Sequence, residues 1–299
     1  MFSRYASQLP GRPRRARLGL EPLDSRVVPA VVLTQLDLDG DGATDDIRIV
    51  GDLRNNKITI HDNGQASVEI QVDGNGDGDT LDAGDLFQSF NFTNDSLVLE
   101  VNLGGGNDSF QYFVDQNFDA SARTLAVNLG AGNDAFVWQM NNHQVGPQSR
   151  IALDVTAGGG ADKVNVTFDK VMTSVASVHA DLGAGVDTYD LAFGRIDNKA
   201  SVDVDTELGA GPNTNTVAFQ GIGIFDKAEM DMTIVGGPQK DTVDLQMLDD
   251  VGNGVLASQA VVSVDLLAGD DVFKGSLDSG GNIFRVDDHS LASISVRGG

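Results

Sequence analysis

The residues best suited to chemistry in this chain are clustered aspartates that can hold a hard metal ion. From residue 37 to 45 the sequence DLDGDGATD places carboxylates at loop positions 1, 3, 5 and 9, which are Asp37, Asp39, Asp41 and Asp45. Gly42 stands at position 6, where glycine permits the sharp bend that wraps oxygen ligands around one ion. The spacing therefore predicts a calcium-binding loop.

A second acidic loop follows in the same part of the chain. Its oxygen-bearing residues are Asp73, Asn75, Asp77, Asp82 and Asp85. Both loops resemble the EF-hand-like loops of extracellular β proteins, such as those with integrin-type repeats, and this resemblance implies Ca²⁺ as the bound ion. No helical pattern flanks either loop, so we expect them between strands. The alternative interpretation is a pair of solvated acidic turns that hold no ion.

A third group of acidic residues recurs in a glycine-rich phrase between Leu103 and Phe273. The phrase reads LGGGNDSF in its first copy and LGAGNDAF in its second, and it occurs seven times. Its carboxylate or amide falls at Asp108, Asp134, Asp162, Asp187, Asn213, Asp241 and Asp271. Successive copies are 26, 28, 25, 26, 28 and 30 residues apart, a period typical of stacked supersecondary units. We expect metal ligands at the aspartates and the weakest binding at the neutral Asn213.

The segments on both sides of each phrase have the period of a half-buried β-strand. Apolar residues alternate with polar ones before the phrase, as in Leu125, Val127 and Leu129, and after it, as in Phe136 and Trp138. We favour an all-β parallel solenoid, of the β-helix or β-roll kind, with coils of about 26 residues. The bulky residue after each Asp would then form an internal ladder. The alternative is a series of antiparallel β-hairpins with the glycine phrase as the hairpin loop.

These corners resemble the calcium-binding nonapeptide of the RTX, or hemolysin-type, family. That repeat has a glycine pair, a spacer, glycine, a spacer, Asp, a spacer and an apolar residue. In the copy at Leu129–Phe136 the matching residues are Gly130, Gly132, Asp134 and Phe136, while Leu129 replaces the first glycine. The resemblance implies Ca²⁺ at the stacked corners. In the alternative interpretation, glycine and Asx residues serve only as turn formers.

The chain is strongly acidic, with 44 Asp and Glu against 20 Lys and Arg. Residues 1–30 hold six of the basic residues and two of the acidic ones, so the remainder has 42 acidic and 14 basic side chains, or −28. Such a charge disfavours nucleic acid as a partner and opposes compaction unless cations neutralise it. The chain has no Cys for disulfides and no run of 18 apolar residues to span a membrane.

The N-terminal segment differs from the rest. Residues 18–30, LGLEPLDSRVVPA, resemble the LEPLE-x-R-x-VPA motif at the start of many large secreted planctomycete proteins. The resemblance implies export, so we expect a secreted or cell-surface protein in which residues 1–30 are a disordered targeting segment. Residues 31–96 are expected to form a β segment that holds both acidic loops and the first coils. Residues 97–299 are expected to form the repeat domain, with an incomplete last coil at Ser290–Gly299.

Catalytic motifs are sparse. The four histidines, His61, His143, His179 and His289, form no H-E-x-x-H motif, and no G-x-S-x-G nucleophile motif occurs. We therefore expect a calcium-binding protein that is not an enzyme and has a structural or adhesive role. Its expected partners are calcium ions, cell-wall or extracellular polysaccharide, and a second copy of the chain. The main alternative is a β-helix lyase or hydrolase that acts on polysaccharide through clustered Asp residues.

Overall fold

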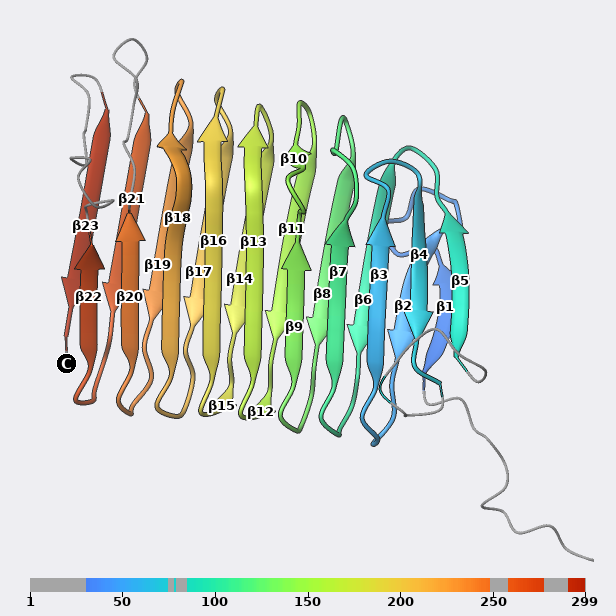
Figure 1. Cartoon of the computed structure of the whole chain (residues 1–299), viewed down its shortest axis with the longest axis horizontal. Coiled ribbons are helices and arrows are strands. Elements are labelled where there is room, and N and C mark those ends of the chain that lie inside the picture. The colour runs from blue at the N-terminus through green and yellow to red at the C-terminus, as the bar shows by residue number, and fades with distance from the viewer. Residues whose placement is uncertain (1–30, 75–77, 79–84, 248–257, 277–289, 299) are drawn as a thin grey trace, which may run out of the picture.

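The computed structural model is an all-β molecule with two long sheets (Figure 1). It describes residues 31–74, 78, 85–247, 258–276 and 290–298. These ranges contain no helix, and hence none that is long and apolar enough to cross a membrane. The targeting segment predicted for residues 1–30 lies outside the described residues.

Ten strands form the first sheet, called sheet A. In spatial order they are β1 (Val32–Leu36), β2 (Asp46–Val50), β6 (Ser96–Asn102), β8 (Ala122–Asn128), β11 (Arg150–Thr156), β14 (Val175–Asp181), β17 (Ser201–Glu207), β19 (Glu229–Val235), β21 (Gln259–Asp265) and β23 (Leu291–Arg297).

Eleven strands form the second sheet, called sheet B. In spatial order they are β22 (Val272–Ser276), β20 (Thr242–Met247), β18 (Thr214–Ile224), β16 (Thr188–Asp197), β13 (Lys163–Met172), β9 (Ala135–Gln139), β7 (Ser109–Val114), β3 (Lys57–Asp62), β4 (Ser67–Val72) and β5 (Leu86–Asn91), with β10 (Gln144–Val145) beside β13. The short strands β12 (Gly159–Gly160) and β15 (Ala184–Gly185) pair at the corners.

Each coil consists of a strand of sheet A, a glycine corner, a strand of sheet B and a connecting loop. β8, β11 and β14 pair in parallel and in register, and so do β9, β13 and β16. Equivalent corner residues are hydrogen-bonded across 25 to 30 positions of sequence, close to the predicted coil length. The predicted parallel solenoid is confirmed, and the antiparallel alternative is wrong for the repeats.

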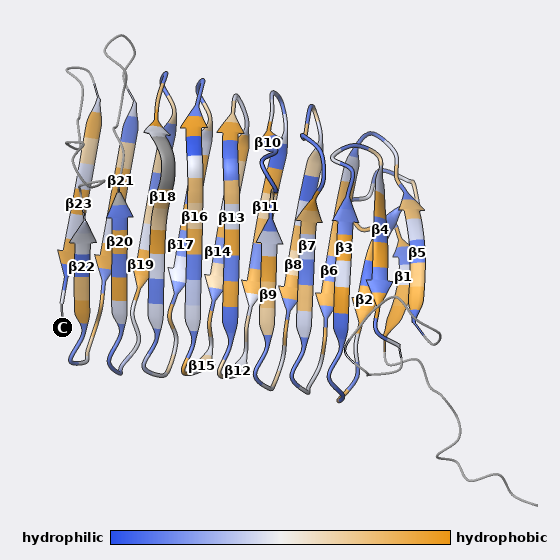
Figure 2. Ribbon diagram, viewed as in Figure 1, coloured by the Kyte–Doolittle hydropathy of each residue, from blue (hydrophilic) through white to orange (hydrophobic). Residues whose placement is uncertain are grey.

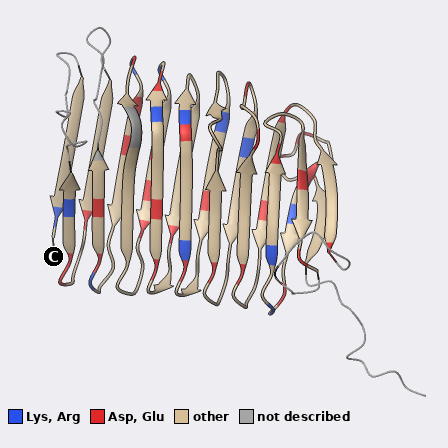
Figure 3. Cartoon of the chain, viewed as in Figure 1, with Lys and Arg blue, Asp and Glu red and all other residues tan. Residues whose placement is uncertain are grey.

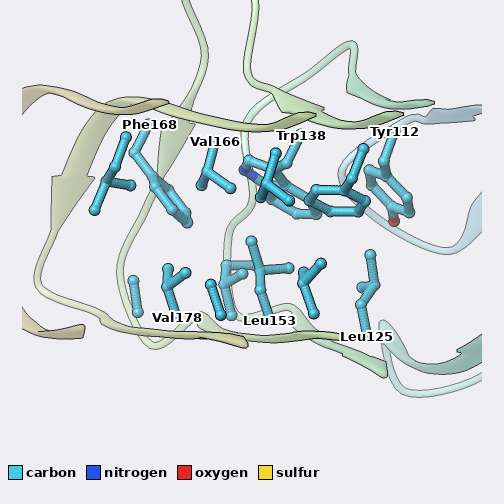
Figure 4. Packing of buried hydrophobic residues seen from close by; sticks show 14 of the residues in the cluster. Tyr112, Leu125, Trp138, Leu153, Val166, Phe168 and Val178 are labelled. Atoms are coloured by element: carbon cyan, nitrogen blue, oxygen red, sulfur yellow. The ribbon is translucent and has the colours of Figure 1, made fainter. Parts of the chain in front are cut away.

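The core lies between the sheets because alternate side chains of each strand point inward (Figure 2). Rings of successive coils stack there: Tyr112 lies 4.8 Å from Trp138, and Phe168 lies 5.6 Å from Phe193, between ring centroids. Smaller side chains of sheet A such as Leu153 face them (Figure 4). Five of the apolar residues two positions after a corner Asp are buried, as predicted for an internal ladder: Phe110, Phe136, Val164, Tyr189 and Val243. Phe273, which follows Asp271 in the last copy, is only partly buried.

Glycine is required at the corners because successive coils touch there through their backbones. Gly132 has a φ of 144°, and a Cβ on it would lie 1.5 Å from the carbonyl oxygen of Gly106 in the preceding coil. Gly160 repeats this contact against Gly132. A side chain at these positions would force the coils apart, so close stacking of the coils requires glycine here.

Some strands at the N-terminal end pair antiparallel and not parallel. β4 and β5 extend sheet B from β3 as antiparallel strands, and β1 pairs antiparallel to β2 (Figure 1). Near them the fully buried Arg123 donates to both carboxylate oxygens of Asp62, at 2.6 and 3.0 Å. Residues 31–96 therefore supply the first coil, β2 and β3, and the antiparallel strands that cover its edges.

At the other end, β23 pairs in parallel with β21 along its whole length. This is the pairing predicted for a strand that precedes a corner.

Candidate metal centre

The first acidic loop brings three carboxylates together. Single oxygens of Asp37, Asp39 and Asp46 all lie within 4.8 Å of one another. Asp37 and Asp39 are exposed, whereas Asp46 is buried at the start of β2. Carboxylate oxygens at this separation can share one divalent cation. The structure therefore groups Asp37 and Asp39 as predicted, and adds a residue that the sequence argument missed.

Asp46 organises the loop through hydrogen bonds to backbone N–H groups. One of its carboxylate oxygens accepts from Leu38 at 2.7 Å and from Asp39 at 3.0 Å, and the other accepts from Val98 of β6 at 2.7 Å. It thus ties the loop to the first coils. The sequence feature that could have pointed to Asp46 is the pair of adjacent aspartates, Asp45 and Asp46, immediately before the apolar strand.

The predicted ligand Asp45 is engaged elsewhere. Its carboxylate accepts hydrogen bonds from the Thr93 N–H at 2.5 Å and from the Thr93 hydroxyl at 2.7 Å. Asp41, the remaining predicted ligand of this loop, accepts the N–H of Ala43 at 2.7 Å. Neighbouring residues of an extended chain point in opposite directions, which is why Asp46 and not Asp45 faces Asp37.

In the second acidic loop the first and last predicted ligands are described. Asp73 accepts the N–H of Gly78 at 2.8 Å, and Asp85 accepts the N–H of Gly74 at 3.1 Å. The second of these bonds holds the two ends of the loop together. The other predicted ligands, Asn75, Asp77 and Asp82, lie outside the described residues.

The corner carboxylates form one continuous row, along the edge of the molecule that carries β12 and β15 (Figure 1). Figure 3 shows acidic segments at the turns of this edge. In each copy Oδ1 accepts the backbone N–H of the equivalent residue one coil earlier. The donor–acceptor pairs are Asn56–Asp108 (2.6 Å), Asp108–Asp134 (2.7 Å), Asp134–Asp162 (2.8 Å), Asp162–Asp187 (2.8 Å), Asp187–Asn213 (2.9 Å), Asn213–Asp241 (3.0 Å) and Asp241–Asp271 (2.8 Å).

Two residues of the row, Asn56 and Asn213, are amides, and the Nδ2 atom of each donates to carbonyl oxygens of the corner. Asn213 donates through Nδ2 to the carbonyl oxygens of Leu208 at 2.6 Å and Gly211 at 2.9 Å. Asn56 likewise donates to the carbonyl oxygen of Arg54 at 2.8 Å. Because Oδ1 of Asn213 accepts the N–H of Asp187 just as Oδ1 does in the Asp copies, we expect the second oxygen of an Asp to take the place of the Asn213 nitrogen. An ionised carboxylate oxygen in that place would face carbonyl oxygens, which have no hydrogen to donate.

The second oxygens are accordingly left without donors. The Oδ2 atoms of Asp108, Asp134, Asp162 and Asp187 are buried and have no hydrogen-bond partner among the described residues. Asp241 is the exception, because the N–H of Gly237 donates to its Oδ2 at 2.7 Å. An unpaired buried carboxylate oxygen is strongly unfavourable, so a cation or a proton is needed beside it. Carboxylate and carbonyl oxygens in one place fit the ligand preference of Ca²⁺.

The acidity of the row reflects the same burial. Burial raises the pKa of Asp108 and of Asp162 to about 6, and the charge of a neighbouring corner Asp adds to the rise. Burial also raises the pKa of Asp134, Asp187 and Asp241 above the ordinary value. Near neutral pH the row is therefore a set of poorly solvated negative charges.

The fold and the row together define a β-solenoid with a carboxylate at nearly every corner. Comparison with known protein families, with curated proteins and with solved structures finds no match for this chain.

Proposed function

We propose that this protein is a calcium-binding β-solenoid with a structural or adhesive role, secreted or held at the cell surface. The observation that carries the proposal is the row of buried corner carboxylates whose second oxygens have no donor. A calcium ion beside such an oxygen would take it and the neighbouring carbonyl oxygens as ligands. The export-type resemblance of Leu18–Ala30 supports the extracellular location.

Bound calcium ions would stabilise the stacking of neighbouring coils. The chain has a formal charge of −24, and its corner carboxylates follow one another from coil to coil. Bound cations would cancel this repulsion only in the folded state, because only there are the equivalent corners adjacent. A ligand at ten times its dissociation constant adds about 1.4 kcal/mol per site, so several weak sites would together dominate stability. The first acidic loop, with Asp37, Asp39 and Asp46, would add a further site beside the antiparallel strands.

The test is a thermal melt of the whole chain, followed by far-UV circular dichroism in millimolar calcium and in EDTA. We expect a higher midpoint in calcium, and magnesium at the same concentration serves as the control for ionic strength. Coincident melting curves in calcium and EDTA would contradict the proposal.

A matched pair of variants locates the effect at the corners. Asp134→Asn places an amide where Asn213 has one, so it should supply donors to the corner carbonyls and reduce the stabilisation by calcium. Asp190→Asn makes the same chemical change at an exposed residue of β16 and should leave that stabilisation unchanged. An equal response of both variants to calcium would place the ions elsewhere.

A polysaccharide-active enzyme is the second candidate, because three polar residues meet on the outer face of sheet A. Asp154, His179 and Asp205 are register partners on β11, β14 and β17 and line one shallow hollow. Two strands that have one strand between them lie about 9.6 Å apart. This strand separation is close to the distance of about 6.5–9.5 Å between the two catalytic carboxyl groups of inverting glycosidases. Polysaccharide turnover that is lost in both Asp154→Asn and Asp205→Asn would support this function.

A further inference from the structure

Both sheets have an unpaired edge at each end of the solenoid. Among the described strands, β23 and β22 are the outermost strands of sheets A and B at one end, and β1 and β5 are the outermost at the other (Figure 1). Each of these four strands is hydrogen-bonded to a described strand on one side only. The backbone N–H and C=O groups on its other side can pair with a strand of another chain.

The apolar core is open at the end formed by β22 and β23. Val262 and Val264 of β21 face the core and are 1% and 2% exposed. Their register partners on β23, Ile294 and Val296, face the same way but are 37% and 45% exposed. Phe273 of β22, which belongs to the internal ladder, is also only partly buried. A partner that covered this end would remove apolar surface from water.

The opposite end exposes apolar side chains as well. Leu86 of β5 is the register partner of the buried Val72 of β4, so it faces the core, and it is 37% exposed. The core-facing Leu33 of β1 is partly buried. On the outer faces of β5 and β1, Phe87 and Val32 are 56% and 52% exposed. Each end of the solenoid therefore offers apolar contact area beside an unpaired strand edge.

The terminal strands at the two ends differ in charge. β22 and β23 carry Lys274 and Arg297 and no acidic residue (Figure 3). β1 and β5 carry no charged residue, and the described segments that hold them, residues 31–46 and 85–91, contain Asp but neither Lys nor Arg. Contact between two like ends would place like charges together, whereas contact between unlike ends places the basic strands beside the acidic segments.

The register of sheet B matches the two ends to each other. Successive strand pairings set both Phe273 and Leu86 level with Ile58 of β3. β5 and β22 also run in the same direction, because two antiparallel pairings separate β5 from β3. If β22 of one copy pairs with β5 of the next, Phe273 meets Leu86 on the core side. The following residues, Lys274 and Phe87, then meet on the outer face, where a cation beside an aromatic ring is favourable.

Sheet A gives the same match. Its successive pairings set Val296 of β23 level with Leu33 of β1. β1 runs opposite to β23, because its pairing with β2 is antiparallel. A contact between β23 of one copy and β1 of the next therefore forms an antiparallel pair with Val296 against Leu33 on the core side.

We propose that the chain assembles head to tail with further copies of itself. In this contact β22 and β23 of one copy pair with β5 and β1 of the next, so that both sheets and the core continue from chain to chain. Because the two surfaces differ, every added copy still presents one free end, and the assembly is open-ended. The contact uses the ends of the solenoid and does not depend on ions at the corner row.

Analytical ultracentrifugation of the full chain over a range of concentrations tests the assembly. We expect an average mass that increases with concentration beyond that of two chains. A strict monomer at every concentration would overturn the proposal, and so would an assembly that stops at two chains.

Two variants each block one end. Ile294→Lys places a charge on the core side of β23, and Leu86→Lys does the same on β5. An inward-pointing charge prevents an edge strand from pairing with another chain. Each variant alone should be monomeric, whereas an equimolar mixture should form complexes of two chains, because each variant supplies the end that the other lacks. A mixture that stays monomeric, or Leu86→Lys alone forming dimers through two like ends, would contradict the head-to-tail contact.

A matched control separates the ends from the rest of the surface. Val175→Lys makes the same kind of change at an apolar residue of β14 that is 41% exposed and lies away from both ends of sheet A. It should assemble like the parent. Far-UV circular dichroism checks that all three variants keep the strand content of the parent. A control that loses assembly as completely as Ile294→Lys would show that the ends are not the contact.

Discussion

Replacing one corner carboxylate by its amide should stabilise the protein when calcium is absent. Asp162 is the best position, because its pKa rises to about 6 from an ordinary 3.8 through burial. A raised folded-state pKa means that the folded protein holds this proton more tightly than the unfolded chain does. The contribution of Asp162 to stability is therefore fully present below pH 3.8 and is lost as the pH rises through about 6. The difference corresponds to on the order of 3 kcal/mol by neutral pH.

Asp162→Asn removes this loss, because an amide does not titrate and can donate to the corner carbonyls as Asn213 does. In EDTA at pH 7 we expect the variant to be more stable than the parent by up to about 3 kcal/mol. Between pH 4 and pH 7 its stability should vary less with pH than that of the parent. Urea denaturation at a series of pH values measures both effects, with Asp190→Asn as the exposed control. A variant that is less stable than the parent in EDTA at pH 7 would refute the reasoning.

Three further predictions concern the core, the corner and the first loop. Phe136→Ala should lower the free energy of unfolding by about 3–5 kcal/mol in urea denaturation, because the ring is fully buried. Gly132→Ala should prevent folding, since its Cβ would lie 1.5 Å from a carbonyl oxygen, whereas Gly105→Ala, with 3.3 Å to its nearest neighbour, should fold, as circular dichroism can show. Asp39→Asn should reduce the heat of calcium binding in titration calorimetry, and Asp45→Asn should change it less.

The repeat architecture could be predicted from the sequence because its causes are local and recur along the chain. The alternation around residues such as Leu125 and Phe136 determines which side chains point inward, whatever the strand pairs with. The glycines of each corner and their period of 25 to 30 residues then favour stacking of like on like. The corner carboxylates were recognisable for the same reason.

Other features depended on contacts between residues far apart in sequence. Asp46 also accepts the N–H of Val98, 52 residues away, and no spacing rule contains the contact that ties the first loop to β6. The antiparallel strands β4 and β5 and the buried Arg123–Asp62 pair, whose residues are 61 apart, likewise belong to no repeat.

The chemical state of the corner row was decided by tertiary structure alone. Sequence shows an Asp in nearly every copy, but only stacking buries it, pairs Oδ1 with the N–H of the preceding coil and, from Asp108 to Asp187, leaves Oδ2 without a hydrogen-bond partner. The sequence by itself thus determined which residues recur and which way they point, since strand and turn preferences act over a few positions. The structure decided which atoms of those residues are left without a partner, because that depends on the neighbouring coil.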